Sequence, residues 1–531
     1  MARDLDTSFT AGVSGGLNLT SIRGLAFQLD GKILVCGEFN HLSGHPTIGV
    51  GRLNPDGSAD TNFTANAATD VFALSVQSDG KILIGGAFTT VDGQTQRFLG
   101  RLNTDGTWDP SFITRPDQRV RGMALQKDGN IIIVGDFTAV DEAPHQRIAR
   151  INADGVVDAS FNPAANITVW TAAAQADGKI LVGGAFTNLS GAARSRLGRF
   201  NSNGSLDTSF NPGIDYNATP QVNALTVQPD GKILVGGAFT SLAGQFRRSL
   251  GRLNSDGSLD TSFDPSNALA GAVTSIVLQS DGGIIVASGN NAYQVDPASG
   301  QVTALLTPQA DNLLRSLALQ RDGQLLVAGN FTTVSGAAHS RIARLRSGDE
   351  PDEILDVDAS GSTVTWSRIG SGPEVAHVAF ERSFNGVDYT SIGIPIHIAG
   401  GWQLTGLSLP TGEFMFLRAR GWAMGGLFNG SSSWIESVKQ FSGILGPQLR
   451  PPTNLGNGAI QLEFFHDRGV NFSIFAATNL SVSFSNWTEI GSPTSLGNGV
   501  FRFTDTEAAT YPQRFYQLRT PPPAAVSPLN K

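Results

Sequence analysis

One short phrase, a glutamine followed by a variable residue and Asp-Gly, returns seven times along the chain. Its aspartates are Asp30, Asp79, Asp128, Asp177, Asp230, Asp281 and Asp322, and the first four are evenly spaced at 49 residues. In six copies the apolar run that follows ends in Gly-x-Phe. A period near 50 residues indicates an array of supersecondary units, none of which can bury its apolar face alone. The repeats therefore predict the architecture of about two-thirds of the chain.

The second repeat shows most clearly how one unit is built. Residues 72–77 (FALSVQ) and 81–88 (KILIGGAF) are apolar runs on either side of an Asp-Gly pair, which favours positive φ and a tight hairpin. Residues 98–103 (FLGRLN) predict a third strand, and a second Asp-Gly pair leads into a short outer strand at 108–112 (WDPSF). Four antiparallel strands joined by tight turns are typical of a propeller blade.

The two ends of the repeat region complement each other. The chain opens with residues 5–9 (LDTSF), which match the outer strand of a repeat, as in residues 259–263. The seventh repeat runs to Leu345 and stops before any such strand. Pairing both ends in one sheet removes two open edges, which are sites of aggregation. We therefore expect residues 1–346 to form a seven-bladed β-propeller whose last blade is closed by the N-terminal strand.

The composition changes after the repeats. Residues 346–353 (RSGDEPDE) form a polar linker, and the short β-type runs beyond it predict a β-sandwich over residues 347–445 that resembles fibronectin type III modules. A second, proline-stiffened linker opens residues 446–520, where further strands predict a C-terminal β-sandwich module. Residues 521–531 are a Pro-rich tail. The predicted fold class is all-β throughout.

Composition also excludes several classes of partner. A net charge of −8 and a pI near 5.4 do not fit a nucleic-acid binder, which needs a basic stripe. Cys36 is the one cysteine, so the chain has no intrachain disulfide, and we expect its thiol to be a small buried apolar group. No stretch is long and apolar enough for membrane insertion. Met1–Arg3 lead directly into the first strand without signal-peptide features, a start that a fragment boundary would explain.

Charged residues recur at two positions of the repeat. An arginine stands at Arg52, Arg101, Arg150, Arg199, Arg252 and Arg344, and an aspartate at Asp6, Asp60, Asp109, Asp158, Asp207 and Asp260. We expect each arginine to pair with a blade aspartate or with backbone carbonyls, because framework contacts follow the symmetry of a repeat whereas catalytic sites break it. A ring of charges lining a channel is the functional alternative.

Calcium is the cation to consider. Asn54, Asp56 and Asp60 place oxygen atoms in one short turn. Calcium takes six or more oxygens, however, and Asn and Asp are common in such turns because their side chains satisfy nearby N–H groups. We therefore expect no metal and no cofactor, with calcium as the open alternative.

Catalysis has weaker support from the sequence. The seven histidines contain no HExxH pattern. His41 and His45 share one long loop, and Glu38, Asp136 or Asp141 would complete a His–acid site on the same face of the ring. A solvated loop histidine is the commoner case. We therefore expect no catalytic residue, and a propeller hydrolase or lyase acting on an extracellular polymer remains the alternative.

The two faces of the ring differ in their loops. Both Asp-Gly turns of a repeat are tight and belong to one face, so the longer loops lie on the other, and binding residues tend to sit on variable loops of a rigid scaffold. The ligand-binding residues that we expect there are Tyr216, Phe246, Asp215, Arg194, Arg247, His41 and His45. Trp402, Trp422 and Trp434 offer a sugar-stacking alternative in the C-terminal part, although sandwich cores also use tryptophan.

The recurring DGKILVGGAFT, followed by RLNxDGSLDxSF, resembles the bacterial delta-60 repeat family. The fifth repeat carries this pattern almost in full from Asp230 to Phe263, whereas the sixth departs from it. The resemblance covers residues 1–346 and implies the propeller region of a secreted or surface protein, with no catalytic residue to carry over. The last module resembles C-terminal β modules of secreted bacterial proteins.

Together these resemblances imply an extracellular or cell-surface binding or scaffold protein. Its loop-rich face would bind a glycan or an extracellular protein. We expect a monomer or a part of a larger surface protein, and a purely structural adhesin is the remaining alternative.

Overall fold

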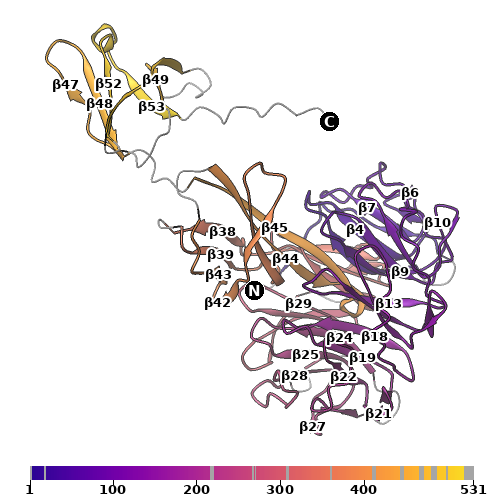
Figure 1. The fold of residues 1–531 in the computed structure, drawn as a ribbon. Helices are drawn as coiled ribbons and strands as arrows, with labels where there is room; N and C mark the ends of the chain where they lie inside the picture. The colour runs from indigo at the N-terminus through magenta and orange to yellow at the C-terminus, as the bar shows by residue number, and fades with distance from the viewer. Residues whose placement is uncertain are drawn as a thin grey trace.

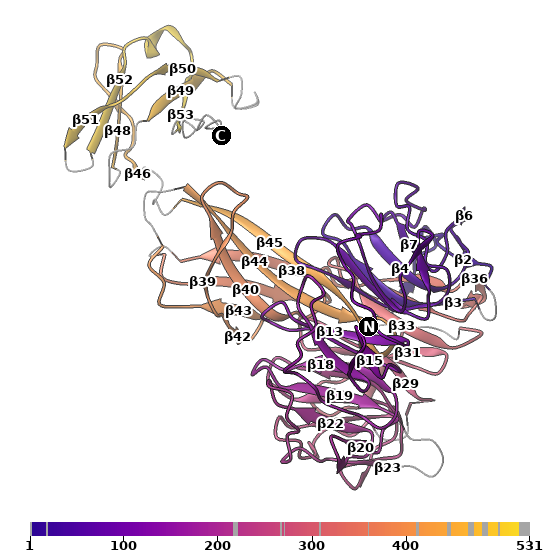
Figure 2. The same ribbon diagram turned by 45° about the vertical axis from the view of Figure 1, so that its right-hand side comes forward.

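The computed structural model describes residues 3–16, 20–215, 221–265, 268–269, 271–306, 310–358, 361–409, 414–442, 448–465, 472–479, 487–497 and 500–519. Within these ranges the chain is nearly all β, as predicted, with two short 3₁₀ turns at η1 (Leu427–Asn429) and η3 (Ala508–Thr510). No helix in the described ranges is both long and apolar enough to cross a membrane. Figure 1 and Figure 2 show a ring of sheets followed by two further β regions.

Seven antiparallel sheets form the ring in the described part of the first 346 residues. Their inner strands are β3 (Ser21–Phe27), β8 (Val71–Val76), β13 (Val120–Leu125), β18 (Val169–Ala174), β24 (Gln221–Val227), β29 (Val273–Leu278) and β33 (Leu314–Leu319). Each inner strand contacts that of the next sheet, and β33 contacts β3, so the ring is continuous. We number the sheets one to seven in chain order.

Each inner strand forms a hairpin with a second strand, which in turn pairs with a third. The second strands are β4 (Ile33–Glu38), β9 (Ile82–Gly86), β14 (Ile131–Gly135), β19 (Ile180–Gly184), β25 (Ile233–Ala238), β30 (Ile284–Ser288) and β34 (Leu325–Gly329). The third strands are β7 (Val50–Leu53), β12 (Leu99–Leu102), β17 (Ile148–Ile151), β22 (Leu197–Phe200), β28 (Leu250–Leu253), β31 (Asn291–Val295) and β37 (Ile342–Arg346). In the sixth sheet, β31 contains the Tyr293 segment that replaces the usual third strand, and β32 (Val302–Leu305) follows it.

Small hairpins cap the sheets on the loop-rich face. They are β5 (His41–Leu42) with β6 (His45–Pro46), β10 (Thr90–Val91) with β11 (Gln94–Thr95), β15 (Ala139–Val140) with β16 (Ala143–Pro144), β20 (Asn188–Leu189) with β21 (Ala192–Ala193), β26 (Ser241–Leu242) with β27 (Gln245–Phe246), and β35 (Thr333–Val334) with β36 (Ala337–Ala338). Two of them gain a third strand, from β2 (Val13–Ser14) and β23 (Ile214–Asp215). These hairpins are the variable loops that the sequence places on this face.

The apolar core lies in layers between neighbouring sheets. Every residue of β9 is buried, because sheets cover both of its faces. Its last residue, Gly86, lies so close to the preceding loop that a Cβ atom there would be 2.4 Å from the carbonyl oxygen of Asp70. This close approach explains why the second glycine of the Gly-Gly pair recurs.

The fourth strand of a repeat is shorter than the sequence predicts. In the second sheet it is a single bridge between Leu102 and Trp108. The chain then turns, because the backbone N–H of Phe112 donates to the carbonyl of Asp109 at 3.3 Å. Only the sixth and seventh sheets of the described ring have a full fourth strand.

The repeated arginine joins each sheet except the sixth to the next. Arg101 donates from Nε to Asp109 at 2.7 Å and from Nη1 to the carbonyl of Ala153, in the following repeat, at 2.6 Å. Its guanidinium also lies over the ring of Phe112, 5.0 Å from the centroid. The other five arginines make the same ion pair at 2.6 to 2.9 Å. The framework interpretation of these charges is therefore confirmed.

The N-terminal segment completes the seventh sheet, as the sequence predicts. Strand β1 (Asp4–Leu5) pairs antiparallel with β37, with Leu5 opposite Leu345. Asp6 then accepts a hydrogen bond from Arg344 Nε at 2.8 Å. Arg344 also donates to the carbonyl of Pro55 in the first repeat at 2.6 Å, so one side chain ties together both ends of the ring.

The second region, residues 352–442, contains two sheets that share one apolar core around the fully buried Trp366. One consists of β38 (Asp352–Val357), β39 (Val364–Ile369), β43 (Gly401–Leu404) and β42 (Ile396–Ile398). The other consists of β41 (Thr390–Gly393), β40 (Ala376–Ser383) and the long strands β44 (Phe414–Gly425) and β45 (Ser431–Ser442). It continues into the second sheet of the ring, because Ser432 of β45 pairs in parallel with Ser75 of β8.

The third region, residues 448–519, packs a smaller core around Phe464, Phe472 and Phe501. Its strands are β46 (Gln448–Leu449), β47 (Thr453–Asn454), β48 (Ile460–Phe465), β49 (Ser473–Ala477), β50 (Thr488–Gly491), β51 (Thr494–Gly497), β52 (Val500–Asp505) and β53 (Phe515–Arg519). The Pro-rich tail lies outside the described residues.

The hairpin of β44 and β45 runs into the ring (Figure 1). Ser433 of β45 accepts from the N–H of Phe27, at the end of β3 that leads into the Asp30-Gly31 turn, so the hairpin enters from the side of the Asp-Gly turns. Its tip, η1, contacts β18, β24, β29 and β33, while β45 contacts β3, β8 and β13, so the hairpin contacts all seven inner strands. Asn429 at the tip is fully buried and donates to Thr226 Oγ1 at 2.6 Å. The same side chain accepts from the N–H of Ile276 at 2.9 Å and donates to its carbonyl at 2.7 Å. The second region therefore fills the centre of the ring, although its sequence lies wholly outside the repeats.

Candidate binding site

A β-bulge interrupts every inner strand at the same place. In β3 the register shifts between Ile22 and Gly24, so Arg23 is the extra residue. Equivalent shifts occur in the other six inner strands. The seven bulged residues, which we call the bulge ring, are Arg23, Phe72, Arg121, Trp170, Asn223, Thr274 and Arg315. Because inner strands end at the Asp-Gly turns, bulges near their beginnings lie toward the loop-rich face.

Bulges re-aim side chains and are over-represented beside functional sites. The residue before each bulge is a buried Ile, Val or Leu that keeps the repeat pattern. The bulged residue itself varies: three are arginine, and the other four are Phe72, Trp170, Asn223 and Thr274. The buried apolar position before the bulge is therefore the same from sheet to sheet. The residue type at the bulge itself changes along the ring.

Three arginines and the buried ring of Phe72 gather on one half of the bulge ring. The guanidinium groups of Arg23 and Arg121 both lie over the ring of Phe72, each 5.2 Å from its centroid. Arg23 pairs with Asp70 at 2.6 Å and Arg121 with Asp136 at 2.7 Å. Sheets seven, one, two and three supply this charged half, whereas Asn223 and Thr274 of sheets five and six are neutral.

The two acids of this half have opposite pKa shifts. Burial raises the pKa of Asp70, and the nearby Arg23 charge does not offset the effect. Burial also opposes ionisation of Asp136, but Arg121 and the Thr168 hydroxyl outweigh it and lower the pKa. Both carboxylates are held by arginines, as structural ion pairs are.

Arg315 differs from the other two arginines of the bulge ring. Its Nε donates to Asn330 Oδ1 at 3.1 Å, and within the described residues no carboxylate pairs with it. Burial lowers its pKa, and the like charge of Arg23 lowers it further. A half-buried guanidinium with a neutral partner is suited to receive an anion or several hydroxyl groups from a ligand.

The residues predicted from sequence belong to separate hairpins. Phe246 is 54% exposed on β27 and lies opposite Ser241, which in turn lies opposite Asp215 on β23. Phe246 and Asp215 thus belong to one small three-stranded sheet, β23-β26-β27, which caps the fifth sheet of the ring. Tyr216, the next residue, lies outside the described residues.

Arg194 and Arg247 are buried rather than exposed, at 7% and 8%. Arg194 donates to the carbonyls of Ala193 and Thr208, and Arg247 donates to that of Phe263 at 3.1 Å. Both side chains therefore anchor their hairpins. Ligand contact by Arg194 and Arg247 stays a prediction. Among the residues predicted from sequence, Phe246 and Asp215 are better placed for such contact, because they are exposed.

His41 and His45 lie in the hairpin of the first repeat. The Nδ1 atom of His41 is 2.7 Å from Asn40 Oδ1, and that of His45 is 3.3 Å from Thr47 Oγ1. Both partners are neutral side chains. Among the described residues, no group of three or more His, Cys, Asp and Glu side chains is placed to hold a metal ion.

Sequence reasoning missed the bulge ring, although a signal exists. Each bulged residue stands seven positions before the aspartate of its inner Asp-Gly turn, as Arg23 does before Asp30. Aligning the repeats on that turn would have isolated this position as one occupied by arginine and aromatic residues within an otherwise apolar strand.

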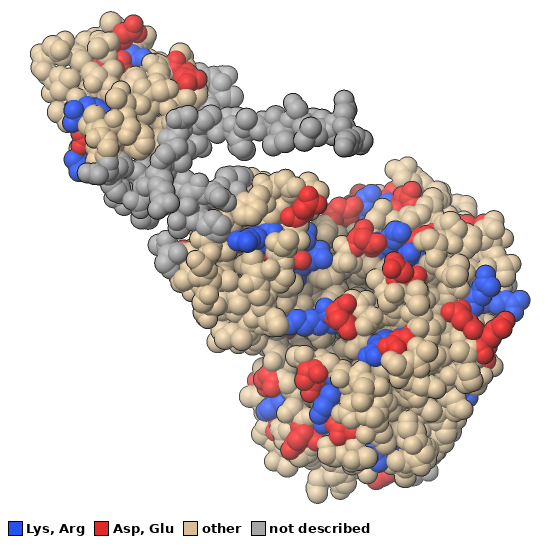
Figure 3. All heavy atoms as spheres, in the orientation of Figure 1, with Lys and Arg blue, Asp and Glu red and all other residues tan. Residues whose placement is uncertain are grey.

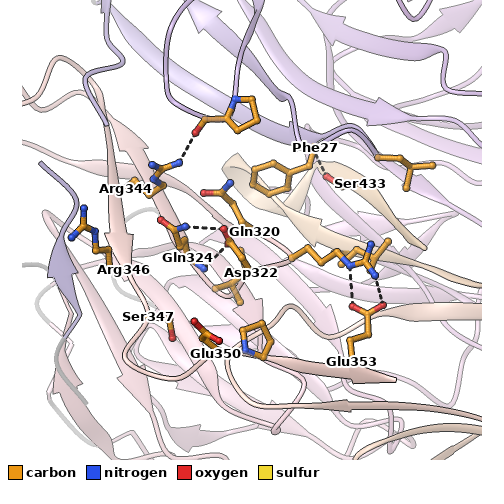
Figure 4. A pocket seen from close by; sticks show the side chains of 18 of the residues that line it. Phe27, Gln320, Asp322, Gln324, Arg344, Arg346, Ser347, Glu350, Glu353 and Ser433 are labelled. Carbon is orange, nitrogen blue, oxygen red and sulfur yellow. Dashed lines mark hydrogen bonds and ion pairs between the residues drawn. The ribbon is translucent and has the colours of Figure 1, made fainter. Parts of the chain in front are cut away.

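A large cleft of about 1040 Å³ lies on the opposite side, between the ring and the second region (Figure 4). Some of its polar groups bind one another: Arg321 pairs with Glu353 at 3.1 Å, and Ser433 accepts from the N–H of Phe27 at 2.7 Å. Figure 3 shows acidic and basic side chains interspersed around this hollow. The cleft is thus a junction between the two regions.

Six segments of the chain match the family described as "Domain of unknown function (DUF5122) beta-propeller". The matches cover residues 28–63, 77–112, 126–161, 175–210, 228–263 and 320–353. The ring is therefore built from β-propeller repeats, and the irregular sixth sheet is the one without a match. No curated protein matches the chain by sequence.

Two solved structures are similar to parts of this chain. The WD40 β-propeller domain of Doa1 is 16% identical, with 66% of this chain and 97% of that domain covered at a TM-score of 0.45. The extracellular domain of a putative hybrid two component system from B. thetaiotaomicron is 11% identical, with 87% of this chain covered at a TM-score of 0.44. The chain spans 58% of the length of that domain.

Proposed function

We propose that the ring is a seven-bladed β-propeller that binds a glycan or a protein outside the cell, on its loop-rich face, without catalysing a reaction. One observation carries the proposal: the bulge ring breaks the symmetry of the repeats with arginine and aromatic side chains. Flat aromatic faces and guanidinium groups suit both sugar rings and protein side chains. The exposed sheet bearing Phe246 and Asp215 extends the same face outward.

The central hairpin supports the choice of face. Because the hairpin of β44 and β45 fills the ring from the Asp-Gly side, a ligand reaches the bulge ring from the loop-rich side. We propose that the second and third regions are β-sandwich modules, the second resembling fibronectin type III, which hold the ring on a larger surface assembly. Asp70 and Asp136 form ion pairs with Arg23 and Arg121, so these two carboxylates give no specific support to the alternative of a hydrolase or lyase.

The test is a thermal-shift screen of the full chain against polysaccharide fragments and extracellular matrix proteins, because a ligand that binds only the folded state raises its melting temperature. We expect Arg315→Gln to abolish a shift that wild type shows. Thr274→Val is the matched control, since it changes the bulge ring on its neutral half. A shift that survives Arg315→Gln, Phe72→Leu and Phe246→Ala would place the ligand elsewhere and refute the proposal, and no shift with any ligand would favour a purely structural scaffold.

A further inference from the structure

A cavity of about 250 Å³ lies on the Asp-Gly side of the fourth to sixth sheets, where the second region covers them. Small and apolar residues of the ring line one side of it, among them Ala174, Val227 and Ile276. A cavity of this size has room for about eight water molecules at ~30 Å³ each, or for an organic molecule of similar bulk. It is separate from the bulge ring, which lies toward the opposite face.

The charged groups of the cavity wall are acidic. Within the described part of the chain, the lining includes two carboxylates, Glu374 and Asp177, and no lysine or arginine. The Glu374 side chain is only 10% exposed, whereas that of Asp177 is 58% exposed. His377 also lines the wall, but burial lowers its pKa to about 4, so its imidazole is neutral at physiological pH. An apolar cavity with a negative wall favours an occupant that combines an apolar body with a positive charge.

The basic groups close to Glu374 do not neutralise it. Arg368 acts on this carboxyl group, but its Nη1 lies 3.5 Å from a carboxylate oxygen of Glu353, and its Nη2 donates to the carbonyl of Pro373 at 2.7 Å. His397 Nε2 lies 3.9 Å from the Glu374 carboxylate, and burial lowers the pKa of this histidine, so its neutral form dominates at physiological pH. Burial raises the pKa of Glu374 to about 7. Such a carboxyl group gains from a cationic partner, because a nearby opposite charge favours its ionised form.

Two of the four tryptophans of the second region have room for a cation. An arginine already lies over the ring of Trp366, 4.4 Å from the centroid, and another lies over Trp434 at 4.5 Å. Trp402 and Trp422 line the cavity instead, and among the described residues no arginine or lysine lies over either ring. Trp402 is the more accessible of the two. The face of an indole attracts an ammonium ion, most strongly where water is excluded.

We propose that this cavity binds a small organic cation, an ammonium group that carries an apolar body. The Glu374 carboxylate pairs with the positive charge, and the indole of Trp402 packs against it. Val227 and Ile276 receive the apolar body. The binding site goes beyond the function proposed for the loop-rich face and does not depend on it.

The experiment titrates the full chain with choline at about pH 8, where the Glu374 carboxyl group is mostly ionised, and follows tryptophan fluorescence and ligand-observed NMR. The matched probe is 3,3-dimethylbutan-1-ol, which has the shape of choline with a carbon atom in place of the charged nitrogen. We expect saturable binding of choline and binding of the alcohol that is at least about tenfold weaker, because the alcohol lacks the charge. Sodium chloride at the same concentration is the control for ionic strength.

Two variants test the residues that hold the cation. Glu374→Gln keeps the shape of the side chain and removes its charge, so it should weaken choline binding about tenfold. Trp402→Leu should weaken it about fivefold. Glu381→Gln is the matched control, since Glu381 belongs to the same region but pairs with Arg418 and does not line the cavity. Its affinity for choline should equal that of wild type.

Four results would each overturn the proposal. They are the absence of saturable choline binding, equal affinities for choline and the alcohol, choline binding that survives both test variants, and an equal loss in Glu381→Gln. The comparison of choline with the alcohol uses the wild-type chain, so the test stays valid should Trp402→Leu fail to fold.

Discussion

Asp6 closes the ring, and its replacement by asparagine is the sharpest test of the framework. The Asp6 side chain is 2% exposed and accepts hydrogen bonds from Ser8, from Arg344 and from Arg346. Asp6→Asn keeps the shape but places an amide against a buried guanidinium. Breaking a buried ion pair by removing one partner costs about 3–5 kcal/mol. Because Arg344 keeps the carbonyl of Pro55 and its stacking on Phe9, we expect the lower end, about 3 kcal/mol.

Asp158→Asn is the matched control, since Asp158 makes the same kind of contacts in the third repeat but is more exposed to solvent. Asp158 pairs with Arg150 and accepts from Ser160, as Asp6 does from its own serine. The Asp158 side chain is 31% exposed, against 2% for Asp6. Exposed ion pairs are worth about 0–1 kcal/mol, so this variant should lose about 1 kcal/mol at most.

Both variants are compared with wild type by guanidinium denaturation of the full chain, with circular dichroism as the readout. Asp6→Asn should unfold at clearly lower denaturant than Asp158→Asn. Burial opposes ionisation of Asp6, but hydrogen bonds from Ser8, Arg344 and Arg346 hold its pKa well below the usual range. A depressed carboxyl pKa gives stability above the unfolded value, about 3.9, that is lost as the pH falls through the folded one. Equal losses in the two variants would refute the closure argument.

Three further predictions concern the central hairpin, the lone thiol and the junction. Asn429→Ala removes the side chain that pairs with the N–H and the carbonyl of Ile276, so it should cost about 2 kcal/mol of stability. It should also speed hydrogen exchange in β44 and β45. Unchanged exchange would contradict the contact. Burial raises the pKa of the Cys36 thiol, so a thiol reagent should label it only after unfolding, and labelling of the folded chain would contradict this. Burial raises the pKa of Glu374 to about 7, so wild-type stability should fall as the pH rises through this value. Glu374→Gln should remove that loss, and parallel pH profiles of the two proteins would disprove it.

The repeat frame could be predicted from sequence because its determinants are local. Tight Asp-Gly turns, apolar strands and the glycine against Asp70 act within a few residues of one another, and the array repeats them. The pairing of β1 with β37 was also predictable, since Leu5 and Leu345 belong to halves of one motif. The bulge position was within reach of the same alignment, because it lies seven residues before the aspartate of each inner Asp-Gly turn, although its residue type varies between repeats.

The exposure of single loop residues was not predictable in the same way. Arg194 and Arg247 have the residue type of a binding surface, yet backbone carbonyls of their own hairpins, those of Ala193 and Phe246, receive their guanidinium groups. Phe246, an apolar residue, is the one left half exposed. Whether a loop side chain turns outward depends on which carbonyls the hairpin leaves without partners, and a sequence does not show that.

The sequence by itself determined the repeats, their turns and the closure of their ends, because each rests on contacts that recur every 50 residues or so. Only the tertiary structure decided what occupies the centre of the ring. The hairpin tip, within residues 425–433 (GGLFNGSSS), is rich in glycine and serine, as surface loops are. Its hydrogen-bond partners lie far away in the chain: Ile276 is 153 residues from Asn429, and Leu74 is 357 residues from Ser431. Contacts at such separations leave no local pattern, so the filled centre and the cavity beside it emerge only when the two regions pack together.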